Sequence, residues 1–231
     1  LFVCNSGGPN RLFNNNGDGT FTNIAASAGV ALSDGLSVGV LPGDLDGDRD
    51  MDLVVLRGGA PAKVFLNDLL GQYHEADLGG LDPRGELGGA LQDFNGDGVL
   101  DLLVLGGEPA ALKLFPGDGR ARFKASDIFA ENTRATASWG PLRALRVADL
   151  DLDGDLDLAV FGAEGHVLLN DGVGRFVLQT RVWAMPAGSE LAGAELCDLN
   201  GDLVPDLLLL ERGPTGRVSV VLRMRFRSSR V

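Results

Sequence analysis

The stretch Asp44-Leu-Asp46-Gly-Asp48-Arg-Asp50-Met-Asp52 occurs in four variants along the chain, and each variant runs directly into a short aliphatic segment. Every copy has Asp at positions one, five and nine, and Asp or Asn at position three. The copies begin at residues 44, 93, 149 and 198. They therefore recur about every 50 residues, which indicates a repeat architecture such as the blades of a propeller. The other three copies span Asp93–Asp101, Asp149–Asp157 and Asp198–Asp206.

Such closely spaced carboxylates repel one another, and a hard divalent cation removes the repulsion. Calcium takes about 6–8 oxygen ligands from carboxylates, amides, backbone carbonyls and water. Alternate positions one, three and five of a tight loop aim three side chains at one point, and Gly at position four or six lets the loop turn sharply. An EF-hand closes with Glu at position twelve and leads into a helix, whereas these copies have Asp at position nine and lead into a strand-like run. We therefore expect calcium loops in a β context; the alternative is acidic turns without an ion.

The charge of the chain is concentrated in these loops. The 231 residues have a formal net charge of −12, and 16 of the 32 Asp and Glu residues lie within the four copies. An acidic chain argues against nucleic acid as a partner. No apolar run approaches the ~20 residues that span a membrane. The chain starts with Leu1 inside a strand-like run and shows no signal peptide, so we expect the natural start to lie upstream.

Each period contains short apolar runs in a fixed order, which predicts four β-strands and hence one propeller blade. We therefore predict an all-β fold: a β-propeller of four-stranded antiparallel blades, with about 4–5 blades present, as an incomplete part of a larger ring or as an unusually small ring. We expect one domain over residues 1–231, with a partial blade at 1–30 and repeats at 31–80, 81–135, 136–185 and 186–231. The strands expected before the loops are Leu36–Leu41, Leu87–Leu91, Leu142–Ala148 and Leu191–Leu196. Those expected after the loops are Leu53–Leu56, Leu102–Leu105, Leu158–Phe161 and Leu207–Leu210. The third strands are expected at Lys63–Asn67, Leu112–Pro116, His166–Asn170 and Arg217–Leu222, and the fourth at Gly71–Ala76, Ala121–Ala125 and Gly174–Leu178.

The two ends of the chain leave alternatives open. The turn Asn14–Gly19 resembles a further calcium loop, but its Asn-Gly and Asp-Gly pairs favour a tight hairpin. The basic segment Arg223–Arg230 either protects a sheet edge or binds an acidic partner. The segments Thr22–Val30 and Ser126–Ala137 could each hold a helical turn. Cys4 and Cys197 form at most one bridge; otherwise they are free thiols.

The loop pattern Asp-x-Asp/Asn-x-Asp-x-x-x-Asp followed by aliphatic residues resembles the FG-GAP/VCBS repeats, the calcium-loop β-propellers of integrin α-chain heads and many secreted proteins. The hairpin phrase Asn10–Phe21 is similar to that family too, and Gly7–Val30 is similar to its cartilage acidic protein subgroup. The resemblance implies that each loop joins the first two strands of a blade, with one calcium ion per loop and up to four in all. It also implies that positions one, three, five and nine bind through side chains and position seven through its carbonyl. The implied ligands are Asp44, Asp46, Asp48, Asp50 and Asp52; Asp93, Asn95, Asp97, Val99 and Asp101; Asp149, Asp151, Asp153, Asp155 and Asp157; and Asp198, Asn200, Asp202, Val204 and Asp206.

The chain departs from the family pattern at four places in the loops. Arg49 and Leu203 replace Gly at position six, Leu152 replaces Gly at position four, and Pro205 lies inside the last loop. The family's closed rings usually have seven blades, more than this chain provides.

Three functions are compatible with the sequence. The resemblance implies a non-enzymatic, calcium-stabilised binding or adhesion module, secreted or extracellular, with a protein or glycan ligand on a loop face. A lectin is the second, with Trp139 and Trp183 as candidate sugar-stacking residues, although packing is the favoured role for both. The third is a propeller scaffold of a secreted hydrolase or lyase, which is poorly supported because no nucleophile or metalloprotease motif accompanies His74 and His166.

Overall fold

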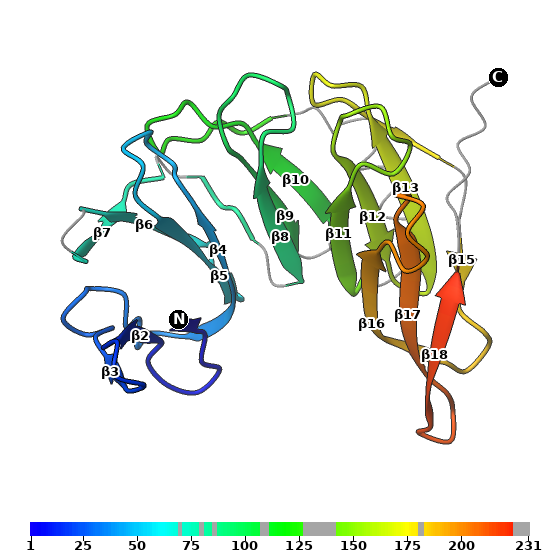
Figure 1. The fold of residues 1–231 in the computed structure, drawn as a ribbon, viewed down its shortest axis with the longest axis horizontal. Coiled ribbons are helices and arrows are strands. Elements are labelled where there is room, and N and C mark those ends of the chain that lie inside the picture. Colours follow the sequence, from blue (N-terminus) through cyan, green and yellow to red (C-terminus); the bar gives the residue numbers. More distant parts are fainter. Residues whose placement is uncertain are drawn as a thin grey trace. The chain divides into compact units, whose positions relative to one another are not determined.

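The fold consists of antiparallel sheets, as the sequence predicts, and the part of the chain that is described contains no helix. The computed structural model describes residues 1–68, 71–78, 81–84, 87–106, 111–126, 142–179 and 183–223. Its sheets are coloured in chain order in Figure 1. The residues cluster into two compact units. The first contains the sheets from β1 to β10, and the second contains those from β11 to β18 together with residues 94–96.

The first unit contains three sheets. Their strand orders are β1-β2-β3, β4-β5-β6-β7 and β10-β9-β8. The first sheet comprises β1 Phe2–Val3, β2 Arg11–Asn15 and β3 Phe21–Asn23. The second comprises β4 Leu36–Gly43, β5 Asp52–Gly58, β6 Lys63–Asn67 and β7 Tyr73–Ala76. The third comprises β8 Gly88–Gln92, β9 Asp101–Gly106 and β10 Ala111–Phe115.

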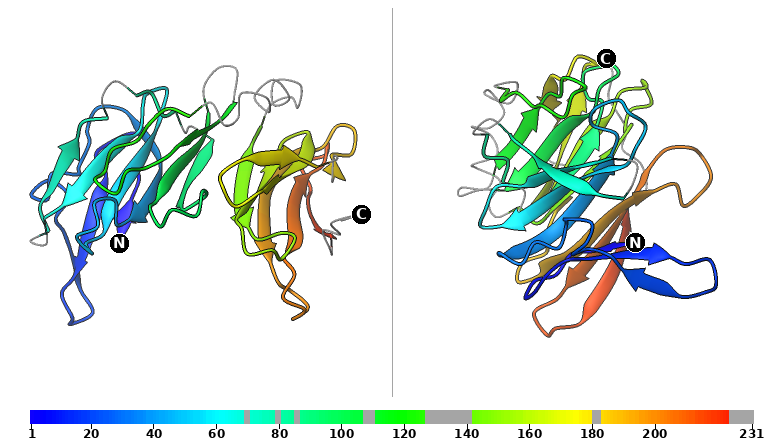
Figure 2. Two further views of the ribbon diagram at one scale, coloured as in Figure 1. Left: turned by 90° about the horizontal axis from the view of Figure 1, so that it is seen from above. Right: turned by 90° about the vertical axis from the view of Figure 1, so that its left-hand side faces the viewer.

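The second unit contains two sheets. Their orders are β11-β12-β13-β14, with β15 also paired to β13, and β16-β17-β18. The first of them comprises β11 Ala144–Ala148, β12 Asp157–Phe161, β13 Glu164–Asn170, β14 Phe176–Leu178 and β15 Trp183–Ala184. The last sheet comprises β16 Glu190–Cys197, β17 Asp206–Arg212 and β18 Val218–Arg223. Two further views show these strands from other sides (Figure 2).

The strand that follows each Asp-rich loop is the most buried part of its sheet. All residues of β9 and β12 are buried. On β5, successive side chains point to opposite faces. Leu53 and Val55 pack with Phe65 in one core cluster, and Val54 and Leu56 belong to another. Both faces of this strand are therefore covered, which explains why its sequence is continuously aliphatic rather than alternating.

Two details differ from the strands that the sequence predicts. The fourth strand expected at Ala121–Ala125 is only an isolated bridge between Gly117 and Phe123. Pro116 accepts a hydrogen bond from the Lys124 N–H (3.0 Å) but has no N–H to return, so the ladder stops there. The short strand β15, which pairs with the beginning of β13, has no counterpart in the expected strands.

The open questions at the chain ends are partly answered. Residues Asn15–Phe21 form the hairpin between β2 and β3, in agreement with the hairpin interpretation. The segment Thr22–Val30, which could hold a helical turn, contains one hydrogen bond with helical spacing, from the Ala28 N–H to the Ile24 carbonyl oxygen (2.8 Å). Cys4 and Cys197 are free thiols. Three features lie almost wholly outside the described residues: Ser126–Ala137, Trp139 and Arg223–Arg230.

Candidate metal centres

Each Asp-rich loop connects the first two strands of its sheet, in the place that the family resemblance implies. The position-one carboxylate organises the loop by accepting backbone hydrogen bonds. Asp44 accepts from the Gly47 N–H (2.8 Å) and from the Arg49 N–H (3.0 Å). In the second and fourth loops the N–H groups of Gly98 and Leu203 donate to the position-one carboxylate in the same way, both at 2.8 Å. The Gly154 N–H of the third loop donates to Asp149 in the same way (3.0 Å), so the position-six contact is common to all four loops.

The departures from glycine do not change the backbone conformation of the turn. Position six has a positive φ in every loop, and the angle is 73° at Arg49 and 67° at Leu203 against 82° at Gly98. At position four, Leu152 has a φ of 63° where Gly47 has 82°. A non-glycine residue in this region costs roughly 1–2 kcal/mol. The loops that lack a glycine therefore keep the turn at a cost in stability.

In the first and third loops, three carboxylates converge. One oxygen from each of positions one, three and five lies within 4.8 Å of the other two. In the second and fourth loops position three is Asn, so an amide oxygen replaces one carboxylate. Hard oxygen donors at such spacing fit calcium, because its ligands lie about 2.3–2.6 Å from the ion. The two triads are Asp44, Asp46 and Asp48, and Asp149, Asp151 and Asp153.

Position seven takes part through its backbone. In each loop its N–H donates to the position-five carboxylate, whichever side chain it carries. A backbone donor is independent of the residue type, which varies at this position; calcium binding by the position-seven carbonyl stays a prediction. The bonds run from Asp50 to Asp48 (2.8 Å), from Val99 to Asp97 (2.9 Å), from Asp155 to Asp153 (3.1 Å) and from Val204 to Asp202 (3.0 Å).

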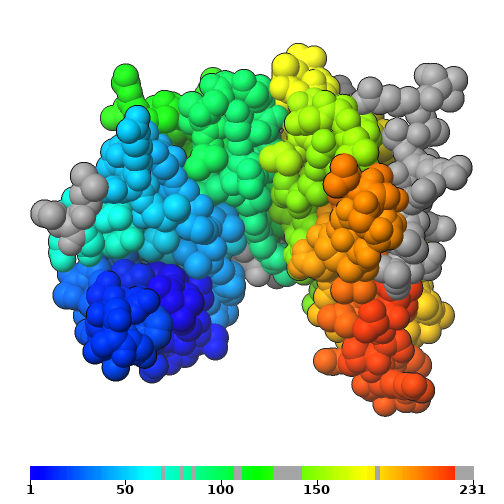
Figure 3. Space-filling view, viewed as in Figure 1, coloured from blue at the N-terminus to red at the C-terminus, as the bar shows by residue number. Residues whose placement is uncertain are grey.

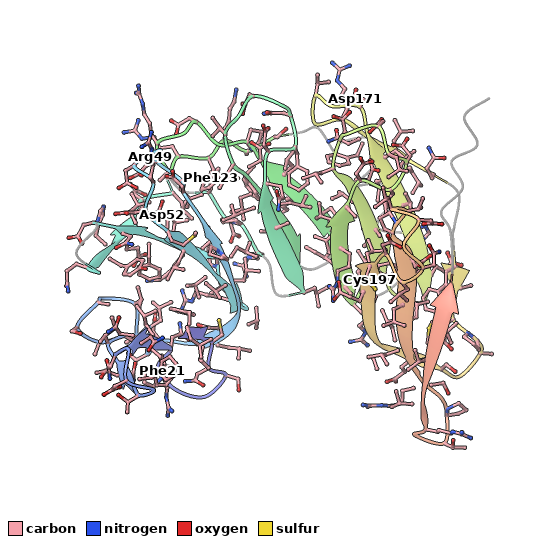
Figure 4. All side chains as sticks on the ribbon, viewed as in Figure 1. Phe21, Arg49, Asp52, Phe123, Asp171 and Cys197 are labelled. Carbon is pink, nitrogen blue, oxygen red and sulfur yellow. The ribbon has the colours of Figure 1, made fainter. Side chains whose placement is uncertain are left out.

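The position-nine carboxylate is fully buried in all four loops, and in the first three it ties the loop to the end of the third strand. Asp52 accepts the Leu45 N–H at Oδ2 (2.8 Å) and the Asn67 N–H at Oδ1 (2.9 Å). Figure 4 shows Asp52 nearer the sheet than Arg49. We call this pair of contacts the position-nine clamp. It is repeated at Asp157, with Leu150 and Asn170 as the donors (both 2.8 Å).

Parts of the clamp recur in the other two loops. The Gly117 N–H donates to Oδ1 of Asp101 (3.0 Å), and the Leu199 N–H donates to Oδ2 of Asp206 (3.1 Å). The sequence does not single out these backbone donors. The donors on the third-strand side, Asn67, Gly117 and Asn170, lie at or just after the end of that strand.

Burial and neighbouring charge perturb the clamp residues of the carboxylate-rich loops. Burial raises the pKa of Asp157 to about 6, against the lowering effect of its two backbone donors. The charges of Asp151 and Asp153 raise it further. The pKa of Asp52 is raised chiefly by burial as well. By contrast, backbone hydrogen bonds, first from Leu203, lower the pKa of Asp198 in the fourth loop. In the first and third loops, burial therefore favours the protonated form of the position-nine carboxyl group.

The sequence pattern of the FG-GAP-like repeat family matches residues 1–55, 93–160 and 149–209, which together contain all four loops. The chain belongs to this family. Its FG-GAP-like repeats are of the propeller type, in agreement with the expected fold class. Curated relatives named cartilage acidic protein 1 are 27% identical in Xenopus tropicalis, 27% in Homo sapiens and 26% in Mus musculus. In each case the match covers 51% of this chain and 28% of the relative, so the chain spans well under two thirds of those proteins.

The other candidate residues of the FG-GAP-like repeats lie away from the loops. His74 is exposed on β7, whereas His166 is buried on β13 with its Nε2 3.6 Å from Oε2 of Glu164. Trp183 is 3% exposed and packs in a core cluster. Among the described residues, no helix is long and apolar enough to cross a bilayer.

Proposed function

We propose that this chain is a non-enzymatic, calcium-stabilised extracellular binding module. The observation that carries the proposal is the convergence of three carboxylates, within 4.8 Å of one another, at the same corner of two repeats. Membership of the FG-GAP-like family and similarity to cartilage acidic protein 1 also support it.

Calcium would be held by the side chains at positions one, three and five of each loop. The position-nine carboxylates complete the anionic shell, and up to four ions would be bound. The ion supplies the positive charge that removes carboxylate repulsion at the corner between two strands. Extracellular calcium modules bind with Kd values of about 10⁻⁴–10⁻³ M. At a calcium concentration ten times Kd, each site would stabilise the fold by about 1.4 kcal/mol.

The ligand of the module is proposed to be a protein or a glycan that binds the loops on one face. Loops on a rigid scaffold are where such sites are usually built. A lectin site that uses Trp183 is disfavoured, because this side chain is buried in the core. Catalysis is disfavoured too, because no nucleophile or metalloprotease motif accompanies the loop carboxylates in the sequence.

Calorimetric titration with calcium, followed by thermal melts in calcium and in excess chelator, tests the proposal. Asp48→Asn removes one triad carboxylate and is expected to weaken calcium binding at the first loop. Asp18→Asn is the matched control, because Asp18 lies in an exposed hairpin turn outside the four loops and accepts the Thr20 N–H and hydroxyl. Equal melting temperatures in calcium and in chelator, with no heat of binding, would refute structural calcium. Secretion of the full-length protein, followed in cultured cells, tests the extracellular location.

A further inference from the structure

The backbone carbonyl at position two of an Asp-rich loop accepts a hydrogen bond from the following repeat. In the first unit, the Ala121 N–H donates to the Leu45 carbonyl oxygen (2.7 Å). In the second unit, the side-chain Nδ2 of Asn170 donates to the Phe94 carbonyl oxygen (2.8 Å). Leu45 and Phe94 occupy the same position of successive loops. The same acceptor is therefore satisfied at these two junctions, although one donor is a backbone group and the other is a side chain.

Asn170 lies at the end of β13, in the hairpin that leads to β14, and is only 6% exposed. Its Nδ2 also donates to the Leu156 carbonyl oxygen (3.2 Å), and its Oδ1 accepts the Gly172 N–H (3.3 Å). Its backbone N–H is the position-nine clamp donor to Asp157. Figure 3 shows this hairpin in yellow beside the yellow-green third loop. Both ends of the buried amide are therefore paired, and one side chain joins the second loop, the third loop and its own hairpin.

The second repeat lacks this asparagine and supplies its donor in another way. Gly117 pairs with Phe123 as Asn170 pairs with Phe176, so the two residues are equivalent. A Cβ on Gly117 would clash with the Leu100 carbonyl oxygen, so no side chain fits there. The donor is instead the N–H of Ala121, which is 4% exposed and has a φ of 56°. Such a conformation is unfavourable for a residue with a Cβ, and strain of this kind is found most often at functional sites.

The side chain of the position-two residue packs on the same part of the next repeat. Leu45 is 3% exposed and clusters with Phe115 and Ala121. The rings of Phe94 and Phe176 meet edge to face, with their centroids 6.0 Å apart. Position two is therefore held twice at each of these junctions, by apolar contacts of its side chain and by the hydrogen bond to its carbonyl oxygen.

The position-two carbonyl belongs to the peptide group that leads into position three. Because a peptide group is planar, a hydrogen bond to its oxygen fixes the orientation of the whole group, and hence the start of the position-three residue. Position three is Asp46 in the first loop and Asn95 in the second. Gly174 lies directly against Asn95 as well, since a Cβ on Gly174 would be 3.3 Å from the Asn95 Cβ. The next repeat therefore restrains the residue that offers the position-three oxygen.

We propose that Asn170 is a positioning residue for the calcium site of the second loop, although it lies in the third repeat. It acts through the Phe94 carbonyl oxygen, by fixing the peptide group from which Asn95 extends. The Ala121 N–H has the same role towards Asp46 in the first loop. The inference rests on the proposed binding of calcium and adds residues that lie outside the loop pattern. Removing a group that orients a metal ligand typically weakens metal binding about 10–100-fold.

A double-mutant cycle, read by calorimetric titration of the whole chain with calcium, tests the role of Asn170. Asn170→Leu keeps the branched shape of the side chain but removes its donor, and it should weaken one calcium site about tenfold or more. In an Asn95→Ala background, where the second loop has lost its position-three ligand, Asn170→Leu should not weaken binding further. In the matched Asn200→Ala background, which impairs the fourth loop instead, the full effect should remain. Equal effects in the two backgrounds would show a general structural role and overturn the proposal.

Hydrogen exchange of the Ala121 amide tests the first loop without any change in the hairpin. This N–H should exchange more slowly in calcium than in chelator, and Asp48→Asn should remove most of the difference. The Leu209 amide on β17, in the other unit, is the control, and its exchange should not respond to Asp48→Asn. Calcium binding without a change at Ala121 would overturn this inference and leave the proposed function standing. Absence of any heat of calcium binding would instead refute the proposed function.

Discussion

The first and third loops differ from the second and fourth in charge but not in backbone. Each loop of the first pair has five carboxylates in its nine positions. Each loop of the second pair has three carboxylates and an Asn at position three. Nevertheless the position-one carboxylate accepts the position-six N–H at 2.8–3.0 Å in all four. The loop conformation is therefore set by hydrogen bonding to the backbone, whereas the charge sets how strongly a cation is needed. Changes at the shared bonds should affect both pairs alike, and changes in charge should separate them.

The largest expected effect comes from breaking the position-nine clamp. Asp52→Ala removes the acceptor of one buried and one half-buried N–H group, and each orphaned group costs about 1–3 kcal/mol. A loss of about 4 kcal/mol in unfolding free energy is expected, in chelator as well as in calcium. Asp101→Ala in the second loop should also destabilise the protein in chelator. Denaturant unfolding measures both; a loss that appears only with calcium would mean that position nine acts solely as a ligand.

The pH dependence of stability should report on the buried position-nine carboxyl group of the third loop. The pKa of Asp157 is about 6 in the folded chain and 3.8 for the unperturbed group, so the native state binds more protons between these values. Stability in chelator should therefore be greatest near the lower pH and fall as the pH rises through about 6, by up to about 3 kcal/mol. Asp151→Asn removes a charge that raises this pKa and should flatten the slope. If stability falls as steeply with pH in Asp151→Asn as in the wild type, the charge of Asp151 does not raise the pKa of Asp157.

Adding a carboxylate at position three should make the calcium affinity of the fourth loop more like that of the first. Asn200→Asp gives the fourth loop the position-three charge of the first. Its calcium affinity should rise about tenfold, equivalent to about 1.4 kcal/mol. In chelator the same change should lower the melting temperature through repulsion. Asp46→Asn is the reverse experiment in the first loop and should have the opposite signs; equal affinities in both variants and the wild type would contradict the role of charge.

The smallest expected effect concerns strain at position six. Leu203 is 81% exposed and has a φ of 67°. Leu203→Gly should stabilise the chain by about 0.5–1 kcal/mol, since relief of strain outweighs the added entropy of the unfolded chain. Gly98→Ala in the second loop should be destabilising by a similar amount. Thermal melts measure the difference, and a less stable Leu203→Gly variant would show that the leucine side chain contributes contacts.

Local patterns predict most of the strands but not the contacts between distant segments. The aliphatic runs after the loops and the third strand Lys63–Asn67 appear where the sequence places them, because each run fits one buried strand. The clamp was not predicted, since the Asn67 N–H lies 15 residues from Asp52 and a backbone donor leaves no trace in residue type. The sequence predicts a fourth strand at Ala121–Ala125 in the second period, but the ladder ends at Pro116, which has no N–H to donate. The residue types do not predict the positive φ at Arg49 and Leu203, because glycine is the usual residue in that conformation.

One hydrogen bond links a loop to the repeat that follows it. The carbonyl oxygen of Leu45, between Asp44 and Asp46, accepts the Ala121 N–H at 2.7 Å. Neutralising the carboxylates of this loop could shift its backbone. Through this bond, such a shift would displace the turn around Ala121 in the next repeat. Occupancy of one proposed calcium site would therefore be coupled to the next repeat, and we expect the sites to bind calcium cooperatively rather than independently.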